Sequence, residues 1–265
     1  MTVNTQSQNS VASRPILNPP CRGWTRDLIA PANNTSAPGT HETPVVNSIN
    51  DTYLEISRRH NNMRGLLLLF VPIFVATLIF TAPMFTIGEL DIVFLFLAIP
   101  TYTGILWLTA LFIRVDISIP RDEPIRFNRL RRKVYVYSFH FSKWNPIARW
   151  YVTTHPYHWE DLRAELWRQR GGTPQGGLLI TWGVSIAVVK PGTNEVIERF
   201  PLSVGHDEGG SWDYVRTYMQ VGRNALPPVE AFNDPDEVSP MNLALRFAPK
   251  VQWPAEMDAE SRSAG

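Results

Sequence analysis

The sequence has one cysteine, Cys21, among 265 residues. An intramolecular disulfide is therefore impossible, which excludes the small secreted folds that depend on disulfides. Charge is also scarce, because Asp, Glu, Lys and Arg make up 18% of the chain and the formal net charge is +1. Nucleic-acid binders concentrate basic residues to contact phosphates, so this near-neutral balance argues against that class.

Motifs that carry chemistry are scarce as well. The sequence contains no Gly-x-Ser-x-Gly nucleophile motif and no phosphate-binding glycine loop. The spacing of His155 and His158 suits zinc only if further ligands approach, and the candidates are His140, Glu160 and Asp161. We therefore expect no catalytic residues, no metal and no cofactor, and predict that the chain is not an enzyme. A membrane-bound enzyme that uses His155 and His158 is an alternative.

Two long segments have no charged residue at all. Residues 65–85 and 92–113 contain no Asp, Glu, Lys, Arg or His, and their lengths are 21 and 22 residues. About 20 residues cross a bilayer as a helix, so we predict a hairpin of two transmembrane helices joined by residues 86–91. Two buried helices of a soluble core are the alternative, but both would have to be apolar on every face.

The charges that flank these segments predict their orientation. Three arginines lie between residues 58 and 64 and seven bases between residues 114 and 133, whereas the connecting turn carries Glu89 and Asp91. Cytoplasmic flanks of membrane helices are enriched in Lys and Arg, so we expect a multi-pass protein with both termini in the cytoplasm. The basic run at residues 126–133 could also contact anionic lipid headgroups.

The remaining sequence divides into an arm, a juxtamembrane segment, a domain and a tail. Residues 1–50 are rich in Asn, Ser, Thr and Pro and are predicted to be a disordered arm, although Trp24, Leu28 and Ile29 could pack onto the domain. Residues 51–114 are predicted to hold a juxtamembrane helix before the two spans. Residues 229–265 are interpreted as a Pro-punctuated acidic tail, with one possible short strand at Leu243, Leu245 and Phe247.

Residues 115–228 are predicted to form a cytoplasmic β-rich domain. Two-residue alternation and β-branched residues indicate strands, and Pro191 to Asn194 predicts a hairpin turn. The expected strands are 115–119, 133–139, 147–153, 178–190 and 195–202, with a weaker strand prediction at 159–168. An apolar stripe predicts one helix over residues 211–222, with Ser211 as its N-cap. The predicted fold class is α+β, with a mostly antiparallel sheet and a C-terminal helix, similar to pleckstrin-homology modules.

Several motifs between residues 50 and 228 resemble a proteobacterial family of uncharacterised two-span membrane proteins, often encoded beside type VI secretion effectors. The motifs are Pro124 to Arg129, Arg131 to Tyr135, Trp159, Leu162 to Glu165, Arg199-Phe200, Trp212, Val215-Arg216, Tyr218-Met219, Gly222 and Leu226-Pro227. The arm and the tail lie outside the resemblance.

The resemblance implies a role in self-protection, since some members of that family resemble immunity proteins. The expected function is a membrane-tethered immunity protein of the bacterial inner membrane, which binds a cognate type VI secretion toxin and occludes its active site. A membrane-anchored structural or signalling module of the secretion apparatus is the main alternative. Trp and Arg are enriched in binding hot spots. The candidate partner-binding residues are Arg126, Arg129, Arg132, Trp159, Trp212 and Arg216.

Overall fold

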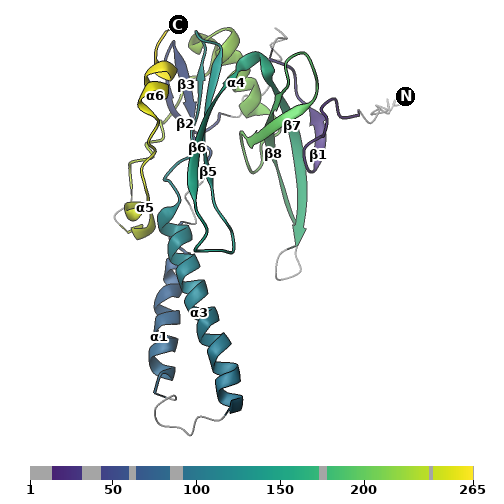
Figure 1. Ribbon diagram of the computed structural model, residues 1–265. Coiled ribbons are helices and arrows are strands. Elements are labelled where there is room, and N and C mark those ends of the chain that lie inside the picture. Colours follow the sequence, from purple (N-terminus) through teal and green to yellow (C-terminus); the bar gives the residue numbers. More distant parts are fainter. Residues whose placement is uncertain are drawn as a thin grey trace, which may run out of the picture.

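The structure is a computed structural model that describes residues 14–31, 43–59, 64–83, 92–172, 178–238 and 241–264. Within these residues the chain is an α+β fold with two antiparallel sheets, and a pair of apolar helices projects from one end of it (Figure 1). The predicted α+β class with mostly antiparallel sheet is confirmed.

The first sheet has four antiparallel strands in the order β1-β7-β8-β9. Its strands are β1 (Trp24–Asp27), β7 (Leu162–Gly172), β8 (Leu178–Val189) and β9 (Val196–Pro201). The predicted hairpin turn joins β8 to β9, where Thr193 N–H donates to the Lys190 carbonyl at 3.0 Å and Gly192 adopts a φ of 74°. A glycine is favoured at such a positive φ because it has no Cβ.

The second sheet has five antiparallel strands in the order β2-β3-β4-β5-β6. Its strands are β2 (Val46–Ile49), β3 (Tyr53–Ile56), β4 (Ile125–Asn128), β5 (Lys133–His140) and β6 (Tyr151–His158). All four residues of β4 are buried. Ile125 and Phe127 belong to the core cluster, whereas Arg126 and Asn128, on the other face, contact residues of the C-terminal helix α6 (Ala255–Arg262).

The core lies between the two sheets and the helix α4 (Gly210–Gln220), which sits at the end farthest from the apolar helices (Figure 1). Core side chains of β3, β4 and β5 alternate along each strand and meet those of β7, β8 and β9. The short 3₁₀ segments η2 (Trp159–Asp161) and η3 (Arg223–Ala225) flank β7 and α4. The predicted helix at 211–222 and the strands at 133–139, 178–190 and 195–202 are confirmed to within a few residues.

The juxtamembrane helix predicted after residue 51 is wrong over residues 53–56, which form β3. Leu54 and Ile56 are buried in the core and pair with Phe127 and Ile125, while Glu55 lies on the opposite face. This two-residue alternation is the pattern of a half-buried strand, and pairing with β4 outweighs the local helix preference. Residues 60–63 lie outside the described residues.

The prediction of a disordered arm is wrong where the structure describes it. Residues 24–27 form β1 and residues 46–49 form β2. Trp24 pairs with Trp167, and Leu28 packs against the core, so the alternative in which this segment packs onto the domain is confirmed. Residues 1–13 and 32–42 lie outside the described residues.

Three local predictions near the helices are also wrong. The strand expected at 115–119 is the last part of helix α3 (Ile92–Ser118), and the strand expected at 243–247 is helix α5 (Leu243–Phe247). Gly209, not Ser211, occupies the N-cap of α4, and the Asp207 carboxylate accepts from the Gly209 N–H at 2.8 Å. A carboxylate near a helix N-terminus satisfies free N–H groups, which explains the acidic residue before this helix.

Candidate membrane and partner interfaces

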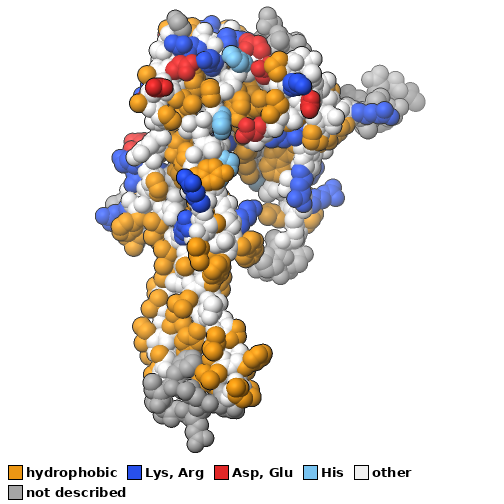
Figure 2. Space-filling model, in the orientation of Figure 1, with side chains coloured by type: hydrophobic (Ala, Val, Ile, Leu, Met, Phe, Trp, Pro, Cys, Tyr) orange, Lys and Arg blue, Asp and Glu red, His pale blue; other side chains and the backbone are white. Residues whose placement is uncertain are grey.

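Helix α3 is long and apolar enough to cross a membrane by length and composition. Its 27 residues extend about 40 Å at 1.5 Å per residue. Ala98, Leu111 and Asp116 are its only buried residues, and most of the other side chains along it are apolar. Figure 2 shows this region as a hydrophobic stalk beneath a domain that carries the charged side chains of the visible face.

The other predicted span is represented by a shorter apolar segment, Leu67–Thr81. It consists of the 3₁₀ segment η1 (Leu67–Phe70) and helix α1 (Val71–Thr81), and it packs along α3 (Figure 1). The Phe112 ring lies 6.2 Å from that of Phe70 and 5.6 Å from that of Phe74. Among the described residues, one helix meets the length of a span; the predicted turn at 86–91 lies outside them.

Polar groups fasten the two apolar helices together where they meet the domain. The Arg64 guanidinium donates to the carbonyls of Asp116 at 3.1 Å and Pro120 at 2.7 Å, and also to that of Ile119. The buried Asp116 carboxylate accepts from the Leu68 N–H at 2.9 Å. A cation at a helix C-terminus and an anion at a helix N-terminus both match the helix dipoles, so this pairing fixes the base of the stalk.

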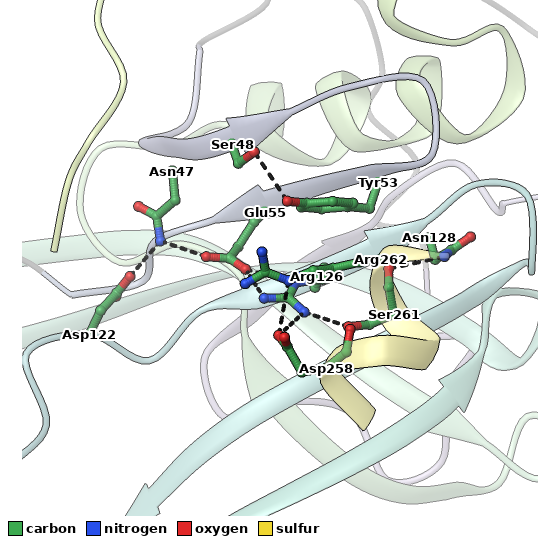
Figure 3. A network of polar contacts seen from close by, with 10 residues as sticks. All are labelled: Asn47, Ser48, Tyr53, Glu55, Asp122, Arg126, Asn128, Asp258, Ser261 and Arg262. Atoms are coloured by element: carbon green, nitrogen blue, oxygen red, sulfur yellow. Dashed lines mark hydrogen bonds and ion pairs between the residues drawn. The ribbon is translucent and has the colours of Figure 1, made fainter. Parts of the chain in front are cut away.

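Arg126 lies at the centre of the polar network in Figure 3 and is 1% exposed. Its guanidinium binds Glu55 of β3 at 2.6 Å and Asp258 of α6 at 2.9 Å, and it also binds Ser261. A buried charge is tolerated when it is paired and hydrogen-bonded, and both conditions hold here. The network therefore attaches the C-terminal helix to the second sheet.

Two aromatic rings and a second β4 residue complete this attachment. The Arg126 guanidinium lies 5.2 Å from the ring centre of Tyr53 and 4.9 Å from that of Trp253. The Asn128 amide donates to the carbonyls of Ser261 at 3.0 Å and Ser263 at 2.9 Å. The last carbonyls of a helix have no partner inside the helix, so Asn128 satisfies the end of α6.

The acids of α6 respond to this environment. Burial would raise the pKa of Asp258, but the hydrogen bonds and charges of Arg126 and Arg262 together outweigh it and hold the pKa below its ordinary value. The Lys133 ammonium, which donates to Glu260 at 2.5 Å, lowers the pKa of that carboxyl. Both carboxylates are thus stabilised by the sheet on which the helix is docked.

Four of the six predicted partner-binding residues are buried. They are Arg126, Trp159, Trp212 and Arg216. The rings of Trp159 and Trp212 lie 5.2 Å apart in the core, and Arg216 pairs with Asp213 at 3.2 Å. Side chains inside the folded domain cannot contact a partner, so their role is in packing and internal pairing.

The other two predicted residues, Arg129 and Arg132, lie on the turn between β4 and β5. The Arg132 guanidinium binds Glu160 at 2.9 Å and the Met219 carbonyl at 3.2 Å, so the turn lies against the end of α4. Leu130 in the turn and Val221 at the end of α4 are exposed. We call Arg129, Leu130, Arg132 and Val221 the distal patch.

The distal patch is far from the apolar helices. β5 starts beside it and runs for eight residues, or about 26 Å, to a hairpin loop that contacts α3. For a membrane crossed by α3, this position would keep the basic run at residues 126–133 away from the lipid headgroups, a contact that the sequence left open. Arg126 of this run is also enclosed beneath α6.

The histidines considered for zinc lie on β6. His155 and His158 are three residues apart, so their side chains point to opposite faces of the strand. His155 pairs with Val136 across the sheet, and His158 with Lys133. Within the described parts of the chain, no group of three or more His, Cys, Asp or Glu side chains is placed to hold a metal ion.

The sequence interpretation missed the residues of the tail that complete the Arg126 network. A signal for them was present, because Pro254 is followed by Glu256 and Asp258 in the first helical turn and by Arg262 in the last. That distribution of charge marks the start and end of a helix. Nothing local indicates that Asp258 meets Arg126, which is 132 residues away in the chain.

A model of the Family of unknown function (DUF6708) matches residues 103–265, which is more than half of the chain. The match includes the tail. No curated protein and no solved structure matches the chain.

Proposed function

We propose that this chain, which belongs to the Family of unknown function (DUF6708), is a membrane-anchored binding protein that holds its two-sheet domain at a bilayer. Helix α3 carries the proposal, because it is an apolar helix of sufficient length in which only Ala98, Leu111 and Asp116 are buried. An apolar surface of this extent is stable in lipid and unstable in water.

We extend this anchor to two spans. The uncharged stretch at residues 65–85 contains η1 and α1, which lie alongside α3 and pack on it through Phe112. The arginines that flank both stretches support an orientation with both termini in the cytoplasm. The domain would then face the cytoplasm. The likeness of its fold to pleckstrin-homology modules stays a prediction.

The partner that we propose is a toxin of type VI secretion, and the role is immunity at the bacterial inner membrane. The resemblance of the sequence motifs to a family encoded beside such effectors supports this choice. The chain would neutralise the toxin by binding and covering its active site, without catalysis or a cofactor. In a strain that keeps the neighbouring effector, deletion of the gene should stop growth; unchanged growth during active secretion would contradict immunity.

The distal patch is the surface that we propose for toxin binding. It combines the exposed Leu130 and Val221 with the half-exposed Arg129 and Arg132, at the end of the domain farthest from α3. Apolar side chains surrounded by arginine are typical of the centre of a protein interface. A patch at this end remains accessible when the stalk is in the membrane.

A capture experiment with matched variants tests this surface. The full chain is purified in detergent from cells that express the neighbouring effector, and bound proteins are identified by mass spectrometry. Leu130→Glu and Val221→Glu should lose the toxin, while Phe232→Glu should retain it. Phe232 is a matched control because it is about as exposed as Leu130 and Val221 but lies outside the distal patch. The next residue, Asn233, donates its N–H to the Val46 carbonyl at the start of β2, away from the distal patch.

Two results would contradict the proposal. Capture of secretion machinery without a toxin would favour the structural or signalling module. Toxin capture that is unaffected by Leu130→Glu and Val221→Glu would leave immunity in place and reject the distal patch.

A further inference from the structure

The loop that joins β5 to β6, residues 141–150, carries large apolar side chains on its outer surface. Trp144 is 78% exposed and Ile147 is 77% exposed, and Phe141 is exposed beside them. Lys143 and Arg149 are exposed in the same ten residues. We call residues 141–150 the hairpin loop.

Internal contacts hold the hairpin loop in shape. The Asn145 side-chain oxygen accepts from the N–H groups of Ile147 at 2.9 Å and Ala148 at 3.2 Å. At the base of the loop, the Trp150 ring lies 5.6 Å from that of Phe141. Trp144 and Ile147 therefore point outward from an ordered turn. Their apolar side chains are not buried against the rest of the described chain.

The hairpin loop is fastened to the side of α3. The Trp107 indole N–H donates to the Trp144 carbonyl at 3.0 Å. The Arg114 guanidinium donates to the Pro146 carbonyl and lies 4.4 Å from the ring centre of Trp150. Figure 1 shows the ends of β5 and β6 reaching down beside the upper part of α3.

The attachment point sets the depth of the loop relative to a membrane. Trp107 precedes Ile113, the last residue of the uncharged stretch, by six residues, which is about 9 Å along the helix axis. A hydrocarbon layer about 30 Å thick would be filled by residues 92–113. The hairpin loop, which is attached at Trp107 and Arg114, would then lie between the headgroup boundary and a depth of about 9 Å in the acyl chains. Trp is enriched in this boundary region.

We propose that the hairpin loop inserts into this interface as a second contact between the domain and the lipid bilayer. This inference rests on the proposed crossing by α3. Trp144 and Ile147 would enter the acyl-chain boundary, while Lys143 and Arg149 would reach anionic headgroups with their charged ends. Two separate contacts fix the tilt of the domain and direct the distal patch away from the membrane.

Spin labels on the full chain in vesicles test the insertion. Single cysteines are introduced as Ile147→Cys, Phe96→Cys and Val221→Cys in a Cys21→Ser background and carry a nitroxide. The protein is reconstituted in vesicles of phosphatidylethanolamine and phosphatidylglycerol, and collisions with oxygen and with a water-soluble nickel chelate are measured. Phe96 is an exposed residue of α3 and reports on the span, and Val221 reports on the distal patch.

We expect the labels at 96 and 147 to collide more with oxygen and less with nickel than the label at 221. If the label at 96 lies in lipid and that at 147 behaves like that at 221, the insertion of the hairpin loop is wrong and the anchor stands. If the label at 96 is accessible to nickel, as the label at 221 is, the anchor and the insertion are both wrong.

Discussion

Arg126 is a buried cation whose partners come from separate parts of the chain. Glu55 belongs to β3, Asp258 to α6 and Trp253 to the segment before α6. Removal of one member of a buried ion pair leaves the others with unpaired charge, which costs more than the pair itself contributes. At this position the arginine is part of the internal structure rather than a contact for a partner.

Arg126→Met should lower the stability of the domain by about 3 kcal/mol, near the low end for buried pairs because Asp258 is partly exposed. For a chain of this size, this corresponds to a fall in Tm of about 6 to 12 °C. Thermal unfolding of the full chain in detergent measures it.

Arg262→Met is the matched control for this variant. Arg262 pairs with the same Asp258 at 3.0 Å, but its side chain is half-exposed. Exposed pairs contribute less than about 1 kcal/mol, so its Tm should fall much less. Equal changes in the two variants would contradict the role of Arg126 as the centre of the network.

For single residues, the sequence indicates which types of side chain matter but not where they lie. Arg and Trp are common in interfaces, which is why the sequence predicts partner contacts at Arg126 and Trp212. Trp is also often buried when its N–H has a partner, and Arg is tolerated in a core when it is paired. The Trp212 indole N–H donates to the Ile29 carbonyl at 2.8 Å. That carbonyl is 183 residues away, so no local pattern predicts the contact.

Helix α6 is held to the second sheet largely by its acids. Asp258 faces Arg126, and Glu260 faces Lys133. The pKa of each carboxyl lies below its ordinary value, which is 3.8 for Asp and 4.5 for Glu. A carboxyl with a lowered pKa stabilises the folded state when the pH is above the ordinary pKa of the group. That contribution is lost as the pH falls through the lowered pKa.

Acid should therefore loosen α6 before the rest of the domain. We expect amide protection in residues 255–262 to persist at neutral pH and to fall once the pH drops below about 4, where these carboxyls begin to bind protons. Hydrogen exchange of the full chain over a pH series, corrected for intrinsic rates, measures it. Helix α4 is the internal control, and simultaneous loss of protection in α4 and α6 would contradict selective release.

Whether a helix or strand can be predicted from the sequence depends on the length of its hydrophobic pattern. Strands with sustained alternation, such as β5 and β8, and the amphipathic helix α4 were predicted. Short segments were misassigned, because four residues of β3 and five of α5 carry too little pattern to distinguish strand from helix. The end of α3 was misassigned because Val115, Ile117 and Ile119 happen to alternate.

The arrangement of the whole molecule depends on contacts that are distant in sequence. β1 pairs with β7, placing Trp24 opposite Trp167. β3 pairs with β4, although the whole apolar region lies between these two strands in the sequence. The apolar helices are thus an insertion between two neighbouring strands of one sheet, which ties the stalk firmly to the domain. The long uncharged stretches were evident from the sequence, whereas this insertion was not, since strand order leaves no local signal.

We propose that the stalk formed by α1 and α3 lies in a bilayer, and extraction of membranes with alkaline carbonate is the sharpest test of that position. Carbonate releases proteins that are bound only at the surface, whereas a helix buried in hydrocarbon stays in place. We expect the full chain to remain in the membrane pellet after the carbonate wash and to enter the supernatant only with detergent. Recovery of the chain in the carbonate supernatant would contradict it.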